Sequence, residues 1–594
     1  MLMAEYVHPY RDTEFVLDEV LGFERLCAEL GLADIQGDLA AAVLAEAGKL
    51  GTEVLAPLNA VGDRQGVRLT EQGVQEAPGF ADAYRHFSEG GWCSLTASEA
   101  FGGQALPNVL GTAVSEIWHA ANMSFALCPL LTQGAIEALA HHASPELQAL
   151  YLPRLVSGEW TGTMNLTEPD AGSDLAAVKA RAVPEGEHYR ITGQKIFISW
   201  GDHQMTPNVI HLVLARLPDA PVGVKGISLF LVPKFLLNTA GEAGEPNDVR
   251  CVSLEHKLGI HGSPTCTMSF GEQGGAIGYL VGEPHAGLAC MFTMMNHARQ
   301  AVGLQGLAIS ERAWQDARAY ARERLQGSHR DGSRYPIIRF PDVRRMLMQM
   351  KASTEAMRAL ALIASAELDC ARHAPDEASA RARQGRVDLY TPIIKGWLTE
   401  LAQEVTSLAV QVHGGMGYVE ETGVARHFRD ARILPIYEGT SGIQAMDLVG
   451  RKTLANGGAL LAELLDDIET TLGHLRQDAC CSALATPLAE ALTAARHARQ
   501  HLLEGAANDP ALPGSVAFNL MMLLGYLCGG WAMARSALAA SSALAAGRGD
   551  PLFLEAKLIT VRFYADHLLP RTGALLSSVL AGSHSTMALA EELF

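Results

Sequence analysis

The chain has 594 residues, enough for several domains of roughly 100–200 residues each. Its formal net charge of −19 and its pI near 5.5 argue against a nucleic acid or an anionic membrane as the main partner. The ten cysteines are scattered without the spacing of zinc ligands, so we expect free thiols, no metal site and a reducing compartment.

The N-terminus and the apolar runs show no pattern of export or of a membrane span. Residues 1–18 are polar and acidic, unlike a signal or transit peptide. The longest wholly apolar run, Leu520 to Ala534, contains glycines and is shorter than the roughly 20 residues that a span needs. We therefore expect a cytoplasmic protein without stable membrane insertion, in which this run forms a buried helix.

The first 160 residues have the apolar spacing of helices, with a connector around 56–80 that is rich in glycine and proline. After residue 38 the expected helices are Leu39–Leu50, Phe80–Glu89, Val109–Ala121, Gln133–His142 and Pro145–Ser157. From about 162 to 272 short apolar runs bounded by glycine and proline predict strands. These are Ala177–Val183, Tyr189–Thr192, Val209–Arg216, Ile227–Val232 and Thr265–Phe270.

Helical patterns return after residue 283 and are longer than an average globular helix. We expect Gly287–Ala321, Pro341–Ala374 and Pro392–Val412, with a loop over 326–335, to pack as an antiparallel bundle. The chain is therefore predicted to be mainly α with an inserted β domain. The predicted parts are an N-terminal extension (1–37), a helical domain (38–161), a β domain (162–282), a helical bundle (283–455) and an extra helical domain (456–594).

The segment Ile433 to Gln444 contains one carboxylate, Glu438, between a tyrosine and a glycine. The proline in the preceding apolar run predicts extended chain there, and Ser441 and Gln444 have the spacing of a capping box for a following helix. A general base needs such a fixed backbone with room for a reactant. Considered without other evidence, a glutamate at such a position is more often simply exposed to solvent ahead of a helix.

Three further motifs contain groups that suit a flat, polar-edged ligand. Met164 to Asp174 places hydroxyls, a glycine and backbone N–H groups in a turn. In Gly193 to Gly201, Phe197 and Ser199 lie two residues apart and so share one face of a strand. In Gln411 to Tyr418 a long helix ends in glycines that permit close approach of a ligand. Each motif alone also fits an ordinary turn, a core strand or a helix C-cap.

Taken together and in this order, the motifs Thr167-Glu168-Pro169-Asp170-Ala171-Gly172-Ser173-Asp174 and Tyr437-Glu438-Gly439-Thr440 resemble the acyl-CoA dehydrogenase family, over roughly residues 40–450. The N-terminal extension and extra C-terminal domain resemble its large-chain branch, which includes enzymes for 3-methylmercaptopropionyl-CoA. The resemblance implies a helical N-domain, a middle β-barrel-like domain and a C-terminal four-helix bundle. It also implies non-covalent FAD and α,β-desaturation of an acyl-CoA thioester.

Individual roles follow from the same resemblance. Glu438 matches the catalytic base. The FAD contacts match Met164, Leu166, Thr167, Gly172, Ser173, Phe197, Ser199, Arg324, Gln411, Gly415 and Thr440. Acyl-CoA contacts match Ser173, Asn296, Arg299 and Gly439. The chain departs from the family pattern at Leu325-Gln326-Gly327, which follows Arg324, and at Gly442, where a glutamine is common. Ala298 stands where some members carry an alternative glutamate base, which leaves Glu438 as the candidate.

The expected function is fatty-acid β-oxidation of medium- or long-chain acyl-CoA, with an electron-transfer flavoprotein as electron acceptor. The sequence leaves open a thioether acyl-CoA as substrate, an acyl-CoA oxidase, and a DNA-binding alkylation-response flavoprotein, which the acidic charge disfavours. The apolar run 520–534 must be shielded from water by other parts of the protein or by a partner. We expect it to be buried within its own domain and against a partner subunit, which leaves a homodimer.

Overall fold

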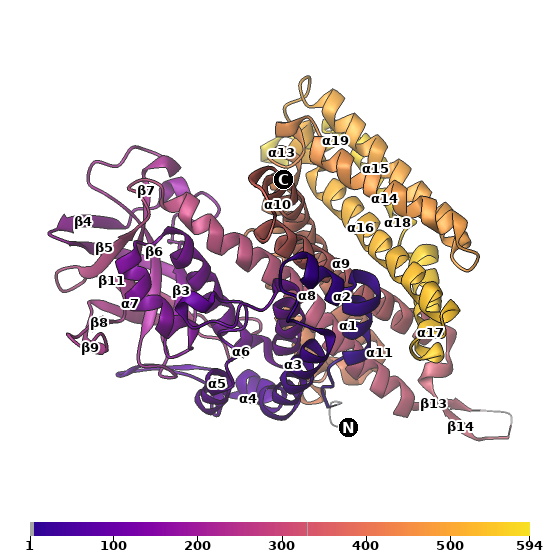
Figure 1. Ribbon diagram of the computed structural model, residues 1–594, viewed down its shortest axis with the longest axis horizontal. Helices are drawn as coiled ribbons and strands as arrows, with labels where there is room; N and C mark the ends of the chain where they lie inside the picture. The colour runs from indigo at the N-terminus through magenta and orange to yellow at the C-terminus, as the bar shows by residue number, and fades with distance from the viewer. Residues whose placement is uncertain (1–4, 329–330) are drawn as a thin grey trace. The chain divides into compact units, whose positions relative to one another are not determined.

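The computed structural model describes residues 5–328 and 331–594, which form long helices and one large β-sheet (Figure 1). The chain divides into two compact units. Unit 1 comprises Met1–Gly48, Pro107–Ala120 and Val302–Phe594, and unit 2 comprises Lys49–Leu106 and Ala121–Ala301. The helices α6 (Asn108–His142) and α8 (Gly287–Glu323) contribute residues to both units.

Unit 2 is built on an eight-stranded sheet in which most neighbouring strands are antiparallel. Its strands in spatial order are β10 (Val249–Leu254), β11 (Thr265–Phe270), β5 (His188–Ser199), β12 (Ala276–Val281), β7 (Ile227–Pro233), β6 (Val209–Arg216) and β3 (Thr161–Asn165), with β4 (Arg181–Glu185) paired to β5 and β6. The middle β domain that the sequence predicted is confirmed.

Alternate residues of β7 enter two hydrophobic cores on opposite faces of this sheet. Leu229 and Leu231 pack in one core with the helical residues Leu152 and Met291, and Phe230 and Val232 lie in the other. Because both faces are covered, the strand is continuously apolar from Leu229 to Val232 and shows no polar alternation there. The helices α7 (Pro145–Val156), α6 and α8 supply the first core from unit 2.

Two details of unit 2 differ from the sequence prediction. The connector at 56–80 contains a helix, α4 (Ala56–Gln65), and the hairpin of β1 (Arg68–Thr70) and β2 (Gly73–Gln75) before α5 (Phe80–Glu89). The range Asn108–His142 (α6) contains two helices that meet at a kink, as expected, but the second follows directly after the kink and begins earlier than the predicted Gln133. At Asn122 the backbone leaves helical geometry (φ −156°, ψ 91°), and its side chain donates to Leu55 O at 3.2 Å. A tertiary hydrogen bond therefore maintains the kink.

The bundle of unit 1 contains α9 (Pro341–Arg372), α10 (Glu377–Ile393), α11 (Thr399–His413) and α13 (Ser441–Gly450), together with α12 (Val424–Ala431). The helix expected to begin at Pro392 begins earlier, at Glu377. It continues through Pro392 into a π-helical segment, η7 (Ile394–Leu398), which leads into α11. The loop expected over 326–335 includes a hairpin of β13 (Leu325–Ser328) and β14 (Arg334–Pro336).

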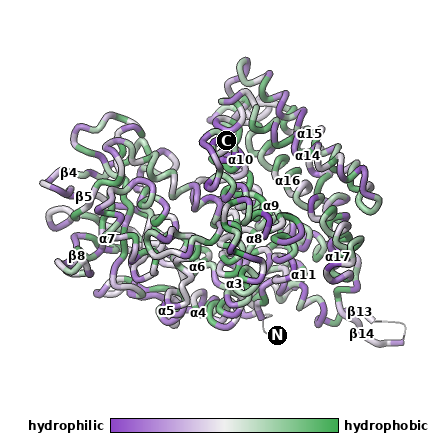
Figure 2. Tube along the Cα trace, in the orientation of Figure 1, coloured by the Kyte–Doolittle hydropathy of each residue, from purple (hydrophilic) through white to green (hydrophobic). Residues whose placement is uncertain are grey.

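The extra C-terminal helices also lie in unit 1, where α14 to α18 run side by side (Figure 1). They are α14 (Ala459–Gln477), α15 (Ala485–Gly505), α16 (Leu512–Ala545), α17 (Pro551–His567), α18 (Arg571–Leu580) and α19 (His584–Met587). Apolar residues follow one another along α16 (Figure 2). By length and composition α6 and α16 could each cross a membrane, but 83% of each apolar window is buried inside the protein, as in a core helix. The predicted burial of 520–534 is confirmed.

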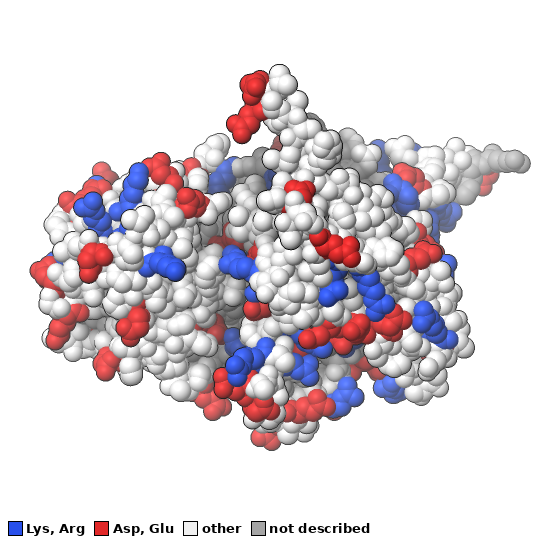
Figure 3. Space-filling view, turned by 90° about the horizontal axis from the view of Figure 1, so that it is seen from above, with Lys and Arg blue, Asp and Glu red and all other residues white. Residues whose placement is uncertain are grey.

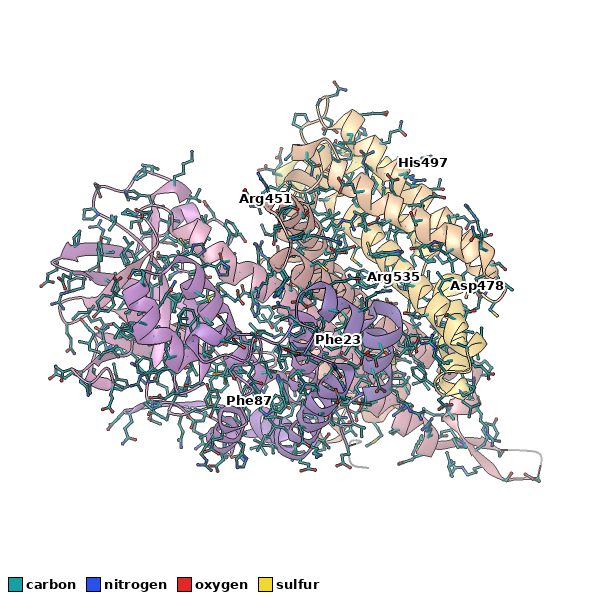
Figure 4. The ribbon with its side chains drawn as sticks, in the orientation of Figure 1. Phe23, Phe87, Arg451, Asp478, His497 and Arg535 are labelled. Carbon is teal, nitrogen blue, oxygen red and sulfur yellow. The ribbon has the colours of Figure 1, made fainter. Side chains whose placement is uncertain are left out.

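The N-terminal extension packs on these C-terminal helices. It contains α1 (Tyr10–Phe15), a π-helical turn (Val16–Leu21) and α2 (Phe23–Glu29), followed by α3 (Gly37–Leu50). Arg535 of α16 donates to Val20 O at 3.3 Å, and Phe15 packs edge-on against Phe553 at 5.7 Å between ring centroids. Figure 4 labels Arg535 on α16 and Phe23 on this segment. The two ends of the sequence thus form one packed layer.

A cluster of charged side chains, most of them buried, connects the N-terminal extension and the C-terminal helices to the bundle. We call it the Arg358 cluster; its members are Asp12, Glu116, Glu311, Lys351, Glu355, Arg358 and Lys557. Arg358 donates to Glu116 at 2.6 Å and to Glu311 at 2.7 Å, and it also pairs with Asp12. Lys557 bridges Asp12 and Glu355. Because its members come from α1, α6, α8, α9 and α17, the cluster joins segments far apart in the sequence.

Candidate active site

The predicted site residues fall into two groups, one in each unit. Glu438 and its neighbours lie in unit 1, on the chain between α12 and α13. This stretch is a series of turns, not the extended segment that the proline suggested: Ile436 N and Tyr437 N both donate to Ile433 O. Tight turns bring Glu438 to the start of α13, where the positive end of the helix dipole lies.

Glu438 has a left-handed backbone, with φ +56°, and Gly439 follows at φ +90°. A left-handed conformation is strained for a residue with a Cβ, and such strain persists only where the surroundings fix it. The Gln444 side chain fixes it partly, since Nε2 lies 3.2 Å from Glu438 O and 3.3 Å from Gly439 O. Ser441 N adds a bond to Pro435 O at 2.9 Å. The carboxylate therefore stands on a turn of defined geometry.

The cap of α13 differs from the predicted capping box. Thr440 is the N-cap, and its hydroxyl accepts a hydrogen bond from Ile443 N at 3.3 Å. Ser441 instead donates to Glu400 of α11 at 2.5 Å, and Gln444 turns back to the carbonyls described above. Sequence spacing alone could not separate these roles, because threonine and serine stand next to each other and both cap helices.

Lys395 reaches the same turn from the π-helical segment η7. It is fully buried, and its Nζ donates to Gly439 O at 2.6 Å. The Tyr437 hydroxyl donates to Gln305 of α8, and burial followed by the charge of Glu438 raises the pKa of Tyr437 well above its usual value. Lys395 and Gln305 are not among the site residues predicted from the sequence. A lysine among the apolar residues Ile393, Ile394 and Trp397 was the available signal, because a buried lysine must have a partner.

The second group lies in unit 2, where the turn after β3 packs against β5. Lys195 Nζ donates to Leu166 O at 3.0 Å and to Glu168 Oε1 at 2.8 Å, and Ile196 N donates to Thr167 O at 2.9 Å. Glu168 also accepts from Lys179 N and Ala180 N. Burial lowers the pKa of Lys195 to about 8, although the neighbouring Glu168 carboxylate opposes this shift. The first two predicted motifs are thus brought together.

Phe197 projects from β5 at a bulge, where the register with β11 shifts between Cys266 and Met268. It has φ +59°, and the residue is 58% exposed. Bulges commonly redirect a side chain next to a functional site. Ser199 lies on the same, less buried side of the strand, as the two-residue spacing predicted.

The donor set of this group fits the edge and face of a flavin. An exposed aromatic ring on a strained backbone is costly unless a ligand covers it. Among the described residues, neither the Thr167 nor the Ser199 hydroxyl hydrogen-bonds to the protein, so both remain available to a ligand. Gly172 and Ser173 are also exposed, whereas the Met164 side chain is packed in the core. Thr167, Phe197 and Ser199 are therefore the residues here that would hold FAD.

The remaining predicted residues lie elsewhere. Arg324 is exposed where α8 leads into the β13–β14 hairpin, and Gln411 and Gly415 are exposed at the end of α11. All three lie in unit 1 and are open to a ligand or to another subunit. In unit 2, Asn296 is exposed on α8, whereas Arg299 is 4% exposed with its guanidinium 5.8 Å from the Phe292 ring. Both lie inside α8, not at its start.

Among the described residues no group of histidine, cysteine or acidic side chains is arranged to hold a metal ion. The ten cysteines all lie in the described ranges as free thiols, seven of them buried. Burial raises the pKa of the Cys528 thiol to about 12, so this thiol is chemically inert.

Comparison with known families matches nearly the whole chain. Consecutive segments match the acyl-CoA dehydrogenase N-terminal domain (40–159), middle domain (163–272) and C-terminal domain (285–453), followed by an acetyl-CoA dehydrogenase C-terminal-like domain (453–590). The chain is 49% identical to 3-methylmercaptopropionyl-CoA dehydrogenase of Ruegeria pomeroyi, over 96% of this chain and 97% of that protein. It is 32% identical to a butyryl-CoA dehydrogenase of Syntrophomonas wolfei, over the full length of both.

A similar fold occurs in the solved structure of a Bacillus anthracis acyl-CoA dehydrogenase complexed with FAD. The TM-score is 0.75 at 20% identity, and the alignment covers 92% of this chain and 89% of that one. The likeness extends over the extra C-terminal helices as well as over the sheet.

Proposed function

Since the chain belongs to the acyl-CoA dehydrogenase family and binds FAD, we propose that it introduces an α,β double bond into a short acyl-CoA thioester. The first candidate is 3-methylmercaptopropionyl-CoA. The 49% identity over 96% of the chain to a dehydrogenase named for that substrate supports this choice. The butyryl-CoA dehydrogenase that matches at full length is also named for a short acyl group. The medium- or long-chain specificity expected from the sequence is the second candidate.

The observation that carries the catalytic role is the strained turn at Glu438. In this proposal the carboxylate removes the α-proton, and the backbone N–H of Glu438 donates to the thioester carbonyl as negative charge develops there. FAD, when bound, supplies the acceptor for the β-hydride. The bonds from Gln444 hold the turn before substrate arrives, so the base needs no reorganisation during the reaction.

The variant that tests the catalytic role is Glu438→Gln, which keeps the size of the side chain and removes its basicity. We expect turnover to fall by about 100- to 10,000-fold, as for loss of a general base, while FAD absorbance and acyl-CoA binding persist. Turnover is measured with an artificial electron acceptor across acyl-CoA lengths and with the thioether substrate. A variant with wild-type turnover would place the base elsewhere, and a maximum at long chains would favour the second candidate.

We further propose an electron-transfer flavoprotein as electron acceptor and a cytoplasmic location. Free thiols throughout the described cysteines support a reducing compartment. Acidic and basic side chains are interspersed on the face drawn in Figure 3, and the net charge of −19 disfavours nucleic acid as a partner. Hydrogen peroxide formed in air at the rate of substrate consumption would instead identify an oxidase.

A further inference from the structure

The Lys395 ammonium is held on a segment of unusual geometry. The segment η7 (Ile394–Leu398) is π-helical and lies between α10 and α11. A π-helical turn widens the helix and changes the direction of the side chains on it, and such turns are frequent at functional sites. Here Lys395 is directed at Gly439 O, 44 residues later in the sequence, at a distance of 2.6 Å. A hydrogen bond from a charged donor is stronger than one between neutral groups.

This bond acts on the turn that carries the carboxylate. Glu438 and Gly439 are two successive left-handed residues, and Gly439 O accepts from both Lys395 and Gln444. A strained turn keeps one geometry only while such bonds outweigh its alternatives. Without the ammonium, the Gln444 amide remains as a neutral donor to both carbonyls. We therefore expect the turn to survive but to sample other backbone angles, which would move the carboxylate.

The extra C-terminal domain packs closely against the same π-helical segment. Trp397 is fully buried, and α16 passes it at two glycines. A Cβ built at Gly525 would lie 2.1 Å from Trp397 Cγ, and one at Gly529 would lie 2.5 Å from Cη2 of the same ring. A Cβ at Gly396 would lie 2.2 Å from Met521 Sδ of α16. The two helical segments therefore approach closely, and a larger residue at any of these glycines would force its neighbour to move.

We propose that Lys395 is a positioning residue for the Glu438 carboxylate, and that helix α16 of the C-terminal domain holds Lys395 in place through Trp397. This inference rests on the proposed role of Glu438. It gives the C-terminal domain a part in catalysis through the close packing of α16 on η7. Removing the ammonium, or displacing η7, misplaces the base without removing it.

The test measures removal of the α-proton separately from hydride transfer. Each protein is incubated in D₂O without an electron acceptor, and deuterium entry at the α-carbon of the acyl-CoA is followed by mass spectrometry. The probe is whichever of 3-methylmercaptopropionyl-CoA and octanoyl-CoA the wild type exchanges faster. For Lys395→Met we expect exchange to fall by about 100-fold, the scale of a displacement of about 1 Å, with FAD content and acyl-CoA affinity retained. Lys395→Arg, which keeps a charged donor, should recover part of the loss.

A matched pair of glycine variants tests the role of α16. Gly525→Ala crowds Trp397, whereas Gly530→Ala crowds Leu569, with its Cβ 2.5 Å from Leu569 Cδ2. Both add one methyl group to the same buried helix, but the clash with the base of the Trp397 ring is the closer one, so we expect the larger loss of thermal stability for Gly525→Ala and compare exchange well below both Tm values. Only Gly525→Ala should slow α-deuterium exchange, by 10-fold or more relative to Gly530→Ala at equal FAD content.

Three outcomes distinguish the possible failures. If Glu438→Gln exchanges deuterium at the wild-type rate, the base lies elsewhere and the proposed function is wrong in that respect. If Glu438→Gln abolishes exchange while Lys395→Met retains it, the positioning role is overturned and the base stands. If Gly525→Ala and Gly530→Ala slow exchange equally, α16 acts only through general stability, and its part of the proposal is overturned.

Discussion

Replacing Arg358 with methionine tests whether the Arg358 cluster stabilises unit 1. The guanidinium is 1% exposed and makes hydrogen bonds to Glu116 at 3.1, 3.0 and 2.6 Å and to Glu311 at 2.7 Å, besides its bond to Asp12. Methionine fills similar space but leaves these carboxylates buried without that cation. Breaking a buried ion pair by removing one partner costs about 3–5 kcal/mol.

This loss of stability can be measured as a fall in the melting temperature, Tm. Unit 1 spans roughly 350 residues, and at about 2.1 cal/mol/K of unfolding entropy per residue this loss lowers Tm by about 4–7 °C. The assay is differential scanning calorimetry of the FAD-loaded enzyme. Arg11→Met is the control, because Arg11 pairs with Asp550 at 2.9 Å with 69% of its side chain exposed, and such pairs contribute about 0–1 kcal/mol. Equal Tm values for Arg358→Met and Arg11→Met would refute the reasoning.

The other predictions follow from the same contacts. Burial opposes ionisation of Asp12, but Lys557 and Arg358 lower its pKa below the usual 3.8, so its contribution to stability is present above about pH 4 and is lost as the pH falls below it. In Arg358→Met the pKa of Asp12 lies closer to its usual value, so calorimetry from pH 3 to 6 should show a smaller fall of Tm on acidification than in the wild type. Lys195→Met removes the donor to Leu166 O and Glu168, so we expect weaker FAD retention, measured as flavin absorbance per protein after gel filtration, with Lys179→Met at the exposed Asp170 pair as an unaffected control. We propose a homodimer, which light scattering would show as twice the 63.4 kDa chain mass; a tetramer at all concentrations would contradict it.

Local sequence patterns were sufficient to predict the structure of segments whose conformation depends on their own residues. The helices 341–374 and 145–157 were predicted within two residues of α9 and α7, because apolar periodicity and capping residues act over a few turns. The Tyr437-Glu438-Gly439-Thr440 motif could be recognised because its residues are consecutive in the sequence. In the structure Gly439 directly follows the strained Glu438, and Thr440 is the N-cap of α13.

Longer-range features could not be predicted in this way. The π-helical segment η7 interrupts a stretch predicted as regular helix, and its geometry is accompanied by the contact of Trp397 with α16, more than 120 residues later. The left-handed backbone of Phe197 arises at a bulge against β11, which lies in another part of the sequence. In each case the local sequence permits several conformations, and packing against a distant element selects one.

The sequence by itself therefore determined the order of helical and strand-rich regions, and its motifs predicted Glu438 as the base and the hydroxyl and aromatic residues suited to FAD. Only the tertiary structure decided that the N-terminal extension packs on the C-terminal helices through the Arg358 cluster, and that Lys395 faces Gly439. The physical reason is that propensity and periodicity act between neighbours in the chain. Buried charges such as Arg358 and Lys395 instead take whatever partners the packed core brings within hydrogen-bonding distance.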